Sequence, residues 1–205
     1  MKYLIFVLVA CCLISCSTQK IVHSKPAPDP LTSSCLMANG YPAYWLEPNI
    51  GVTTARAFSL RWPVRTLVSV PGEADAPGFW LYDTAAQRLG LAFFRFYPQT
   101  KRPPAERAMC AQPGAEVQFV YRFTVTDKQQ VSLVQSGTVS NLTADSITIS
   151  LTGVDSTVVG AGVVKQGAYL GTIVAQSGGR KPQATVIPAD RVGVLLQNIL
   201  NNRSP

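Results

Sequence analysis

The stretch Thr185-Val186-Ile187-Pro188-Ala189-Asp190-Arg191-Val192 separates the end of the chain from everything that precedes it. It begins with three β-branched residues, which are typical of a strand. Proline then suits the first turn of a helix, and the Asp190 carboxylate complements the positive end of the helix dipole. Apolar residues recur at helical spacing from there on, at Val192, Leu195, Leu196 and Ile199. The sequence therefore predicts a strand that runs directly into a C-terminal helix.

The residues before this stretch form short β-like runs, rich in Val, Thr and aromatic residues and punctuated by Pro, Gly, Asn and Asp. The first series comprises Ala43–Leu46, Gly51–Leu60, Val64–Val70, Gly78–Tyr82 and Leu89–Tyr97. The second series comprises Glu116–Thr126, Gln130–Leu142, Ser146–Leu151, Ala161–Lys165, Ala168–Ala175 and Ala184–Ile187. The chain is therefore expected to be all-β, with one β-rich half at 41–98 and another at 115–188. A basic, proline-rich connector at 99–114 joins them, and the helix and tail occupy 189–205.

The composition excludes several other classes of protein. Of the 205 residues, 47% are hydrophobic and 14% are charged, with a formal net charge of +7. The charged fraction is well below the value of about 25% for an average soluble domain, so the chain is not a charged, disordered tail. The single histidine excludes a His-rich metal site, and we expect no metal or other cofactor.

The first residues have the pattern of an export signal. Met1-Lys2 provides a positive start, and the apolar run at 3–14 is too short to span a bilayer. The run ends in Leu13-Ile14-Ser15-Cys16, which resembles the bacterial lipobox, in which the cysteine is diacylated and becomes the new N-terminus. Leu8-Val9-Ala10-Cys11 fits the same loose pattern after a shorter apolar run, and an ordinary signal peptide is a further alternative. We predict lipidation at Cys16.

Cleavage before Cys16 removes residues 1–15 as a lipoprotein signal peptide. The stretch that follows contains several prolines and has little periodicity, so residues 16–40 are expected to be a lipidated N-terminus and a flexible tether. This tether holds the only histidine, His23. Ser17 follows the acylated cysteine, in place of the aspartate that tends to retain lipoproteins at the inner membrane. By this rule of resemblance, the anchor lies in the outer membrane and the protein faces the periplasm.

The positive charge bears on the expected partners. Removal of residues 1–15 takes away Lys2 and no acid, which leaves 17 basic and 11 acidic residues and a net charge of +6. Nucleic acid is not expected at an envelope address. The expected partners are the membrane, through the acyl chains, and another envelope protein or peptide; a merely solvated basic surface is the alternative.

Two cysteines remain after processing, Cys35 and Cys110. In an oxidising compartment an even pair predicts a disulfide. The closed loop of about 75 residues would stabilise the fold by roughly 4 kcal/mol if the effect is entropic. Two unrelated buried thiols are the alternative.

From Tyr41 to Leu200, the order of elements resembles that of the trypsin-like serine proteases, closest to their bacterial branch. Three motifs of the first half and its border carry the resemblance: Val52–Ala57 resembles Val-Thr-Ala-Ala-His, Leu89–Arg95 resembles Asp-Leu-Ala-Leu-Leu-Arg, and Pro113–Val117 resembles a Pro-Gly turn. Later ones are Ser136–Ser140, similar to a glycine-bearing strand; Gly160–Val164 with Gly171–Val174, similar to Ser-Gly-Gly-Pro and Gly-Ile-Val; and Thr185–Val192, similar to the entry of the final helix. The resemblance implies two β-barrels followed by that helix. Residues 41–98 are short for six strands, which leaves a missing strand or clipped loops open.

The departures from this family concern its catalytic groups, a serine nucleophile, a histidine base and an aspartate that orients the histidine. Arg56 stands where the histidine belongs, and a guanidinium that stays protonated is no base. Gly90 stands where the aspartate belongs and has no carboxylate. Gly160 stands where the serine belongs and has no hydroxyl. The resemblance thus implies a degenerate catalytic triad.

The nucleophile position is the one with alternatives. Gly162 is one of them, and Ser156 is another, although no histidine is available to activate its hydroxyl. A Ser–Lys pair with Lys165 is a further possibility. Val163 and Val164 replace the small and proline residues of the family motif, so we expect ordinary strand in place of an oxyanion loop.

Three functional hypotheses follow. The first is a lipid-anchored periplasmic pseudo-protease that binds a protein or peptide without catalysis, as a scaffold module in an envelope assembly. The second is an active trypsin-like endopeptidase with an atypical centre, and the third is a structural outer-membrane lipoprotein of unrelated β fold. Tyr44-Trp45, next to the tether, is a candidate interface, although most aromatic residues of the first half are expected in the core.

Overall fold

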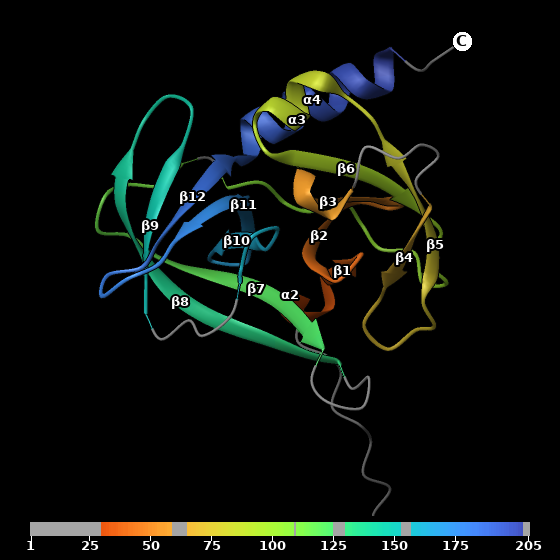
Figure 1. Ribbon diagram of the computed structural model, residues 1–205, viewed down its shortest axis with the longest axis horizontal. Helices are drawn as coiled ribbons and strands as arrows, with labels where there is room; N and C mark the ends of the chain where they lie inside the picture. The colour runs from red at the N-terminus through yellow and green to blue at the C-terminus, as the bar shows by residue number, and fades with distance from the viewer. Residues whose placement is uncertain (1–29, 59–64, 109, 125–129, 153–156, 203–205) are drawn as a thin grey trace, which may run out of the picture.

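Two closed β-barrels of six strands each make up most of the protein (Figure 1). The computed structural model describes residues 30–58, 65–108, 110–124, 130–152 and 157–202. The barrels lie side by side, and the C-terminal helix α4 (Ala189–Asn201) lies across the top of both. The predicted all-β architecture of two barrels and a terminal helix is confirmed.

The first barrel is an antiparallel sheet closed in the order β1-β2-β3-β6-β5-β4. Its strands are β1 (Cys35–Ala38), β2 (Tyr41–Glu47), β3 (Ile50–Thr54), β4 (Arg65–Ser69), β5 (Ala76–Leu81) and β6 (Leu91–Phe96). Three short helical segments accompany them: α2 (Pro30–Ser33), η1 (Ala55–Ala57) and α3 (Thr84–Arg88).

The first barrel begins earlier in the chain than the sequence indicates, because β1 lies inside the predicted tether at 16–40. Cys35 of β1 is opposite Tyr44 of β2, and Met37 is opposite Ser69 of β4. β1 therefore closes the barrel, so the expectation of a barrel confined to 41–98 is wrong, and of the two alternatives left open the missing strand is excluded. All four residues of β1 are buried, so this strand lacks the alternation that would have marked it.

The second barrel is closed in the order β10-β11-β12-β9-β8-β7. Its strands are β7 (Glu116–Thr124), β8 (Gln130–Leu142), β9 (Ile147–Leu151), β10 (Gly162–Lys165), β11 (Ala168–Ser177) and β12 (Gln183–Pro188). Each corresponds to a β-like run of the second series. β9 shows the clearest alternation, with every second side chain buried and the others half-buried.

Among the described residues, three apolar clusters form the core. One fills the first barrel and one fills the second. The third joins both barrels to α4, and its members include Tyr44, Phe93, Tyr169, Ile187, Leu195 and Leu196. Within it the rings of Tyr44 and Tyr169 stack with centroids 4.8 Å apart at 19°. The predicted apolar face of the terminal helix thus packs onto the seam between the barrels.

The connector at 99–114 follows this seam. The Ala105 amide donates to the Leu46 carbonyl of the first barrel, at 2.8 Å. The Tyr169 amide of the second barrel donates to the Glu106 carbonyl, at 2.7 Å. Backbone hydrogen bonds therefore fix the connector to both barrels.

Candidate functional site

Arg56 lies in η1, immediately after β3. The Thr54 side chain caps this turn by accepting a hydrogen bond from the Arg56 amide, at 3.3 Å. The Arg56 side chain is exposed. The position that the resemblance assigns to a catalytic base therefore presents a solvated cation.

Gly90 lies between α3 and β6, beside that turn. The Gly90 carbonyl accepts a hydrogen bond from the Ala55 amide, at 2.7 Å, so the second degenerate position is next to the first. The φ angle of Gly90 is +78°, a left-handed conformation that favours glycine. A Cβ atom here would also come within 3.3 Å of Val174 in the second barrel.

Gly160 precedes β10 and is buried against the first barrel. Its amide donates to the Ile173 carbonyl, at 2.7 Å, and its φ is +99°. A Cβ atom at this position would overlap the Pro42 carbonyl oxygen and lie 2.8 Å from Thr53 Oγ1. Thr53 Oγ1 itself donates to the Pro42 carbonyl, at 2.6 Å, in a buried hydrogen bond. Residues of β2 and β3 thus fill the space of a side chain at the position that the resemblance assigns to the nucleophile.

The structure therefore brings the three degenerate positions to one end of β3. Thr53 contacts Gly160, and two residues later Ala55 is hydrogen-bonded to Gly90, with Arg56 next in the chain. The side chain at Arg56 is the only one that the three positions carry, and it points to solvent.

The alternative positions named from the sequence for a nucleophile or its base are Gly162, Ser156 and Lys165. A Cβ atom at Gly162 would overlap the Tyr44 ring. Ser156 lies outside the described residues. Lys165 donates from Nζ to the Cys110 carbonyl, at 3.2 Å. Val163 and Val164 lie in β10 and pair with β7 and β11, with a register shift between them on the β11 side, so the predicted replacement of a loop by strand is confirmed.

The predicted disulfide between Cys35 and Cys110 is wrong, because both thiols are free. Cys35 is buried in the cluster between the barrels, whereas Cys110 is exposed on the connector. Burial raises the pKa of the Cys35 thiol to about 12, and the nearby Arg122 guanidinium lowers it only in part. An even number of cysteines predicts pairing only when the fold brings them together, and here β1 takes Cys35 into the core.

The predicted N-terminal features lie outside the described residues. These are the signal peptide at 1–15, lipidation of Cys16, the alternative Cys11 and the tether histidine His23.

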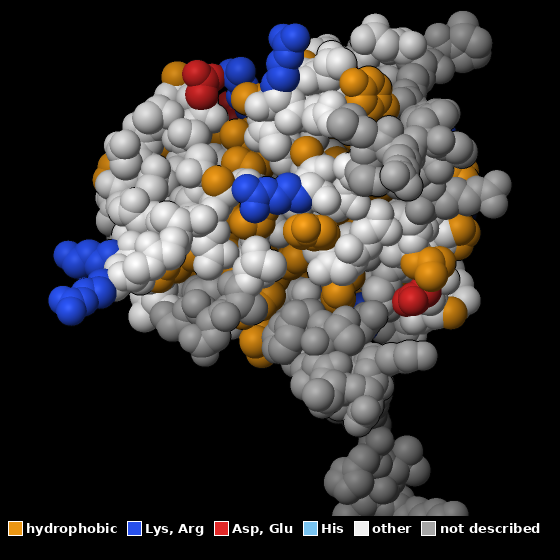
Figure 2. All heavy atoms as spheres, in the orientation of Figure 1, with side chains coloured by type: hydrophobic (Ala, Val, Ile, Leu, Met, Phe, Trp, Pro, Cys, Tyr) orange, Lys and Arg blue, Asp and Glu red, His pale blue; other side chains and the backbone are white. Residues whose placement is uncertain are grey.

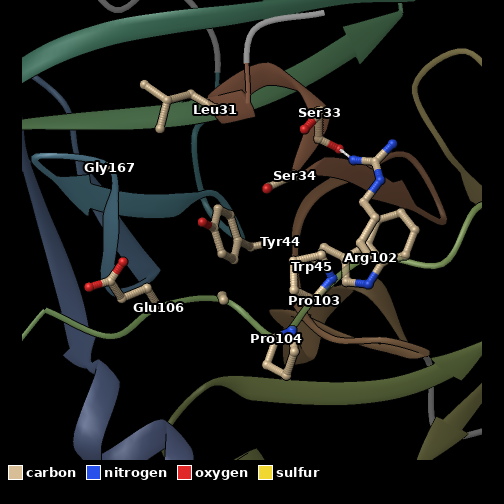
Figure 3. Close-up of a pocket in the computed structure, with 11 residues that line it drawn as sticks. Leu31, Ser33, Ser34, Tyr44, Trp45, Arg102, Pro103, Pro104, Glu106 and Gly167 are labelled. Carbon is tan, nitrogen blue, oxygen red and sulfur yellow. Dashed lines mark hydrogen bonds between the residues drawn. The ribbon is translucent and has the colours of Figure 1, made fainter.

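A groove of about 710 Å³ lies where the two barrels meet the connector. Its lining includes Tyr44, Trp45, Arg102, Pro103, Pro104 and Glu106 (Figure 3). The volume falls in the range of roughly 300–1,000 Å³ typical of ligand pockets. None of the three degenerate positions lines it.

The floor of the groove is aromatic. Tyr44 and Trp45 are only 3% and 2% exposed, Tyr44 in the cluster between the barrels and Trp45 in the core of the first barrel, so the candidate interface named from sequence is largely buried. Burial raises the pKa of Tyr44 to about 12, which keeps this phenol neutral. The Trp45 indole N–H is buried and finds no acceptor among the described residues.

Arg102 covers one part of this floor. Its guanidinium carbon lies 4.4 Å from the centroid of the Trp45 ring, a cation–π contact. Arg102 Nη1 donates to the Ser33 carbonyl, drawn as a dashed line in Figure 3. Glu106 lies on the opposite side of Tyr44 from Arg102. The sequence shows that the connector is basic and proline-rich, but no motif in it indicates that Arg102 contacts Trp45 of β2.

The basic side chains do not form one continuous patch on the face shown in Figure 2, where they occur as separate groups. Within the described ranges, no group of three or more His, Cys, Asp or Glu side chains is placed to hold a metal ion. No helix of the described chain is both long and apolar enough to cross a bilayer.

Comparison with known proteins identifies the fold. No family model matches the chain, and no curated protein sequence matches it. Among solved structures, Rv3671c from M. tuberculosis H37Rv, in a mutant, inactive form, is 16% identical and has a TM-score of 0.66 over 85% of this chain and 90% of that one. An inactive form of the Rv3671c protease is 17% identical, with a TM-score of 0.63 over 82% and 90% of the two chains.

A serine endoprotease from Yersinia pestis gives a TM-score of 0.67 at 9% identity. The match covers 83% of this chain and 64% of that one. These similarities show that the protein has the trypsin-like double-barrel fold. The alternative of an unrelated β fold is therefore wrong.

We predict that Gly160→Ala lowers the free energy of unfolding by about 3 kcal/mol or more, because it adds steric overlap with Pro42 and Thr53 to the strain of a positive φ. Gly114→Ala is the matched control. Gly114 has a φ of +84° and nothing within 4 Å of its Cβ position, so only the backbone strain of about 1 kcal/mol is expected there. Urea denaturation measures both values. Equal losses in the two variants would mean that the Gly160 position is open.

Proposed function

We propose that the protein is a lipid-anchored, non-catalytic trypsin-fold module of the bacterial cell envelope that binds another protein or a peptide. The observation that carries the proposal is the packing at Gly160. A nucleophile needs a side chain that faces substrate, and this position has neither space for a side chain nor access to solvent.

The surroundings of Gly160 support the same conclusion. Val158, Val159 and Ala161 are all at most 3% exposed, so apolar residues occupy the segment before β10. A preorganised oxyanion site requires backbone amides that face the reacting carbonyl. The Gly160 amide is instead bonded to Ile173, and the Ala161 amide to Val158 at 2.9 Å.

The chemistry of the remaining positions also argues against proton transfer. General-base catalysis needs a group that can lose its proton near neutral pH, within hydrogen-bond reach of the nucleophile. Arg56 and Gly90 supply no such group, and the sequence has no histidine after His23.

The proposed location in the cell envelope rests on the sequence. Cys16 ends a lipobox-like stretch, and residues 17–29 separate it from the first described residue. Two or three acyl chains on one cysteine give stable anchoring, whereas a single chain is marginal. The domain would then act close to the outer membrane, on its periplasmic side.

The active-endopeptidase alternative depends on Ser156 or another serine, and an active-site probe separates it from our proposal. We expect no stable labelling of the full mature protein by a fluorophosphonate, and no cleavage of casein, because no base activates a hydroxyl. An active trypsin-like protease serves as the positive control. Labelling or cleavage that disappears in Ser156→Ala would establish the enzyme and overturn the non-catalytic proposal.

Anchoring has a separate test. Cys16→Ser is expected to move the protein from the membrane fraction to the soluble periplasmic or unprocessed pool, because the acceptor of the acyl chains is lost. Cys11→Ser is the matched control and should leave the protein in the membrane fraction. Incorporation of labelled palmitate into the Cys16→Ser protein would show that the lipobox interpretation is incorrect.

A further inference from the structure

The groove at the seam of the barrels lies apart from the degenerate catalytic positions, although β2 connects the two. Pro42 of β2 contacts Gly160, and Trp45 lines the groove three residues later. Three residues of strand span about 10 Å. The groove is therefore a feature of the fold that the loss of catalytic groups does not explain.

One end of the groove carries a cation, Arg102, that makes no ion pair with another residue of the described ranges. Arg102 is half-buried, and burial lowers the pKa of its guanidinium, although the charge of Glu73 opposes this shift. The Glu73 carboxylate accepts hydrogen bonds from the Gln99 and Thr100 amides, at 2.7 and 3.3 Å. A guanidinium has five N–H donors, and the Ser33 carbonyl takes one of those on Arg102. The stacked, fixed guanidinium is suited to bind an incoming carboxylate.

The other end carries an anion. Glu106 is exposed and makes no ion pair with any described residue. Its neighbour Arg107 is directed to Glu47, with 3.7 Å between the charged groups. The carboxylate of Glu106 is thus available to a basic group of a ligand.

Between the two charges the groove is rigid and largely apolar. Pro103 and Pro104 form an exposed rim, and Leu31 contributes a half-buried side chain. Proline has no backbone N–H and a fixed φ, so the backbone of this rim has few accessible conformations. The hydrogen bond from Ala105 to Leu46 holds the rim on the first barrel. Such preorganisation lowers the entropic cost of binding.

The geometry points to this groove as a binding site for an extended peptide segment that carries an acidic side chain for Arg102, a basic side chain for Glu106, and proline or apolar residues between them above Tyr44. This inference rests on the proposed role in peptide binding and names the surface and the ligand chemistry. Opposite charges at the two ends fix the direction of the peptide as well as its composition.

The test uses blocked, fluorescein-labelled peptides in which an acidic and a basic residue are separated by two, four or six residues of alanine and proline. Peptides with two acidic or two basic residues at the same spacings are the controls. Fluorescence anisotropy with the full mature protein should show a preference for one acidic–basic spacing. Glu106→Lys should weaken binding of that peptide by about tenfold, as expected for reversal of a partly solvated pair, and should shift the preference to the doubly acidic peptide.

Glu116→Lys is the matched control, since Glu116 is an exposed acid outside the groove and the change in net charge is the same. It should leave the preference unchanged. Arg102→Gln should weaken binding of the acidic–basic peptide by a similar factor without altering the unfolding midpoint by more than a few degrees.

Several outcomes would overturn the inference: no binding of any peptide at millimolar concentration, an unchanged preference in Glu106→Lys, or the same change of preference in Glu116→Lys. Mass spectrometry of the peptides after incubation separates this result from the proposed function. A peptide that is bound and then cleaved would refute the non-catalytic role and leave the groove assignment standing.

Discussion

The backbone from Gly160 to Gly162, where β10 begins, packs directly onto strand β2, and the arrangement of the two barrels depends on this contact. At Gly160 the neighbour is the Pro42 carbonyl, and at Gly162 it is the Tyr44 ring. Neither position leaves space for a Cβ atom. Because protein interiors are close-packed, a side chain here would push the barrels apart instead of being absorbed.

The same contact positions the rest of the seam. Tyr44 is held between Gly162 and the ring of Tyr169, in the cluster that also takes in the apolar face of α4. Stacking of this kind contributes about 0.5–1.5 kcal/mol beyond the burial of area. Pro42 of β2 contacts Gly160, and Tyr44 and Trp45 of the same strand line the groove. The packing at Gly160 is close, whereas the groove is open and has Arg102 and Glu106 in its lining.

Much of this architecture could be predicted from the sequence, and the exceptions have physical causes. The second barrel is predictable because strands such as β9 bury one face and so alternate. β1 was missed because both of its faces are buried, and α3 because five residues are too few for a helical period. The predicted disulfide between Cys35 and Cys110 was wrong because the number of cysteines carries no information about their distance in the fold.

The degenerate positions were identified by motif, but the groove was not. Arg56, Gly90 and Gly160 lie in motifs of a few consecutive residues, which can be recognised without knowledge of the fold. Arg102 and Trp45 are 57 residues apart in the chain, and their contact depends on how the connector returns along the seam. No local pattern encodes such a contact. Sequence motifs therefore locate the positions that resemble the family's catalytic ones, whereas the structure is needed to locate the groove.

Native-state hydrogen exchange of the Gly160 amide measures whether the segment before β10 is closed. This amide is buried and bonded to Ile173. If the segment is an integral part of the core, its opening free energy equals that of global unfolding, as for the β10 amide of Val163. Exchange through a local opening at about 3 kcal/mol or more below the global value would contradict the account, because it would show a segment that opens to substrate.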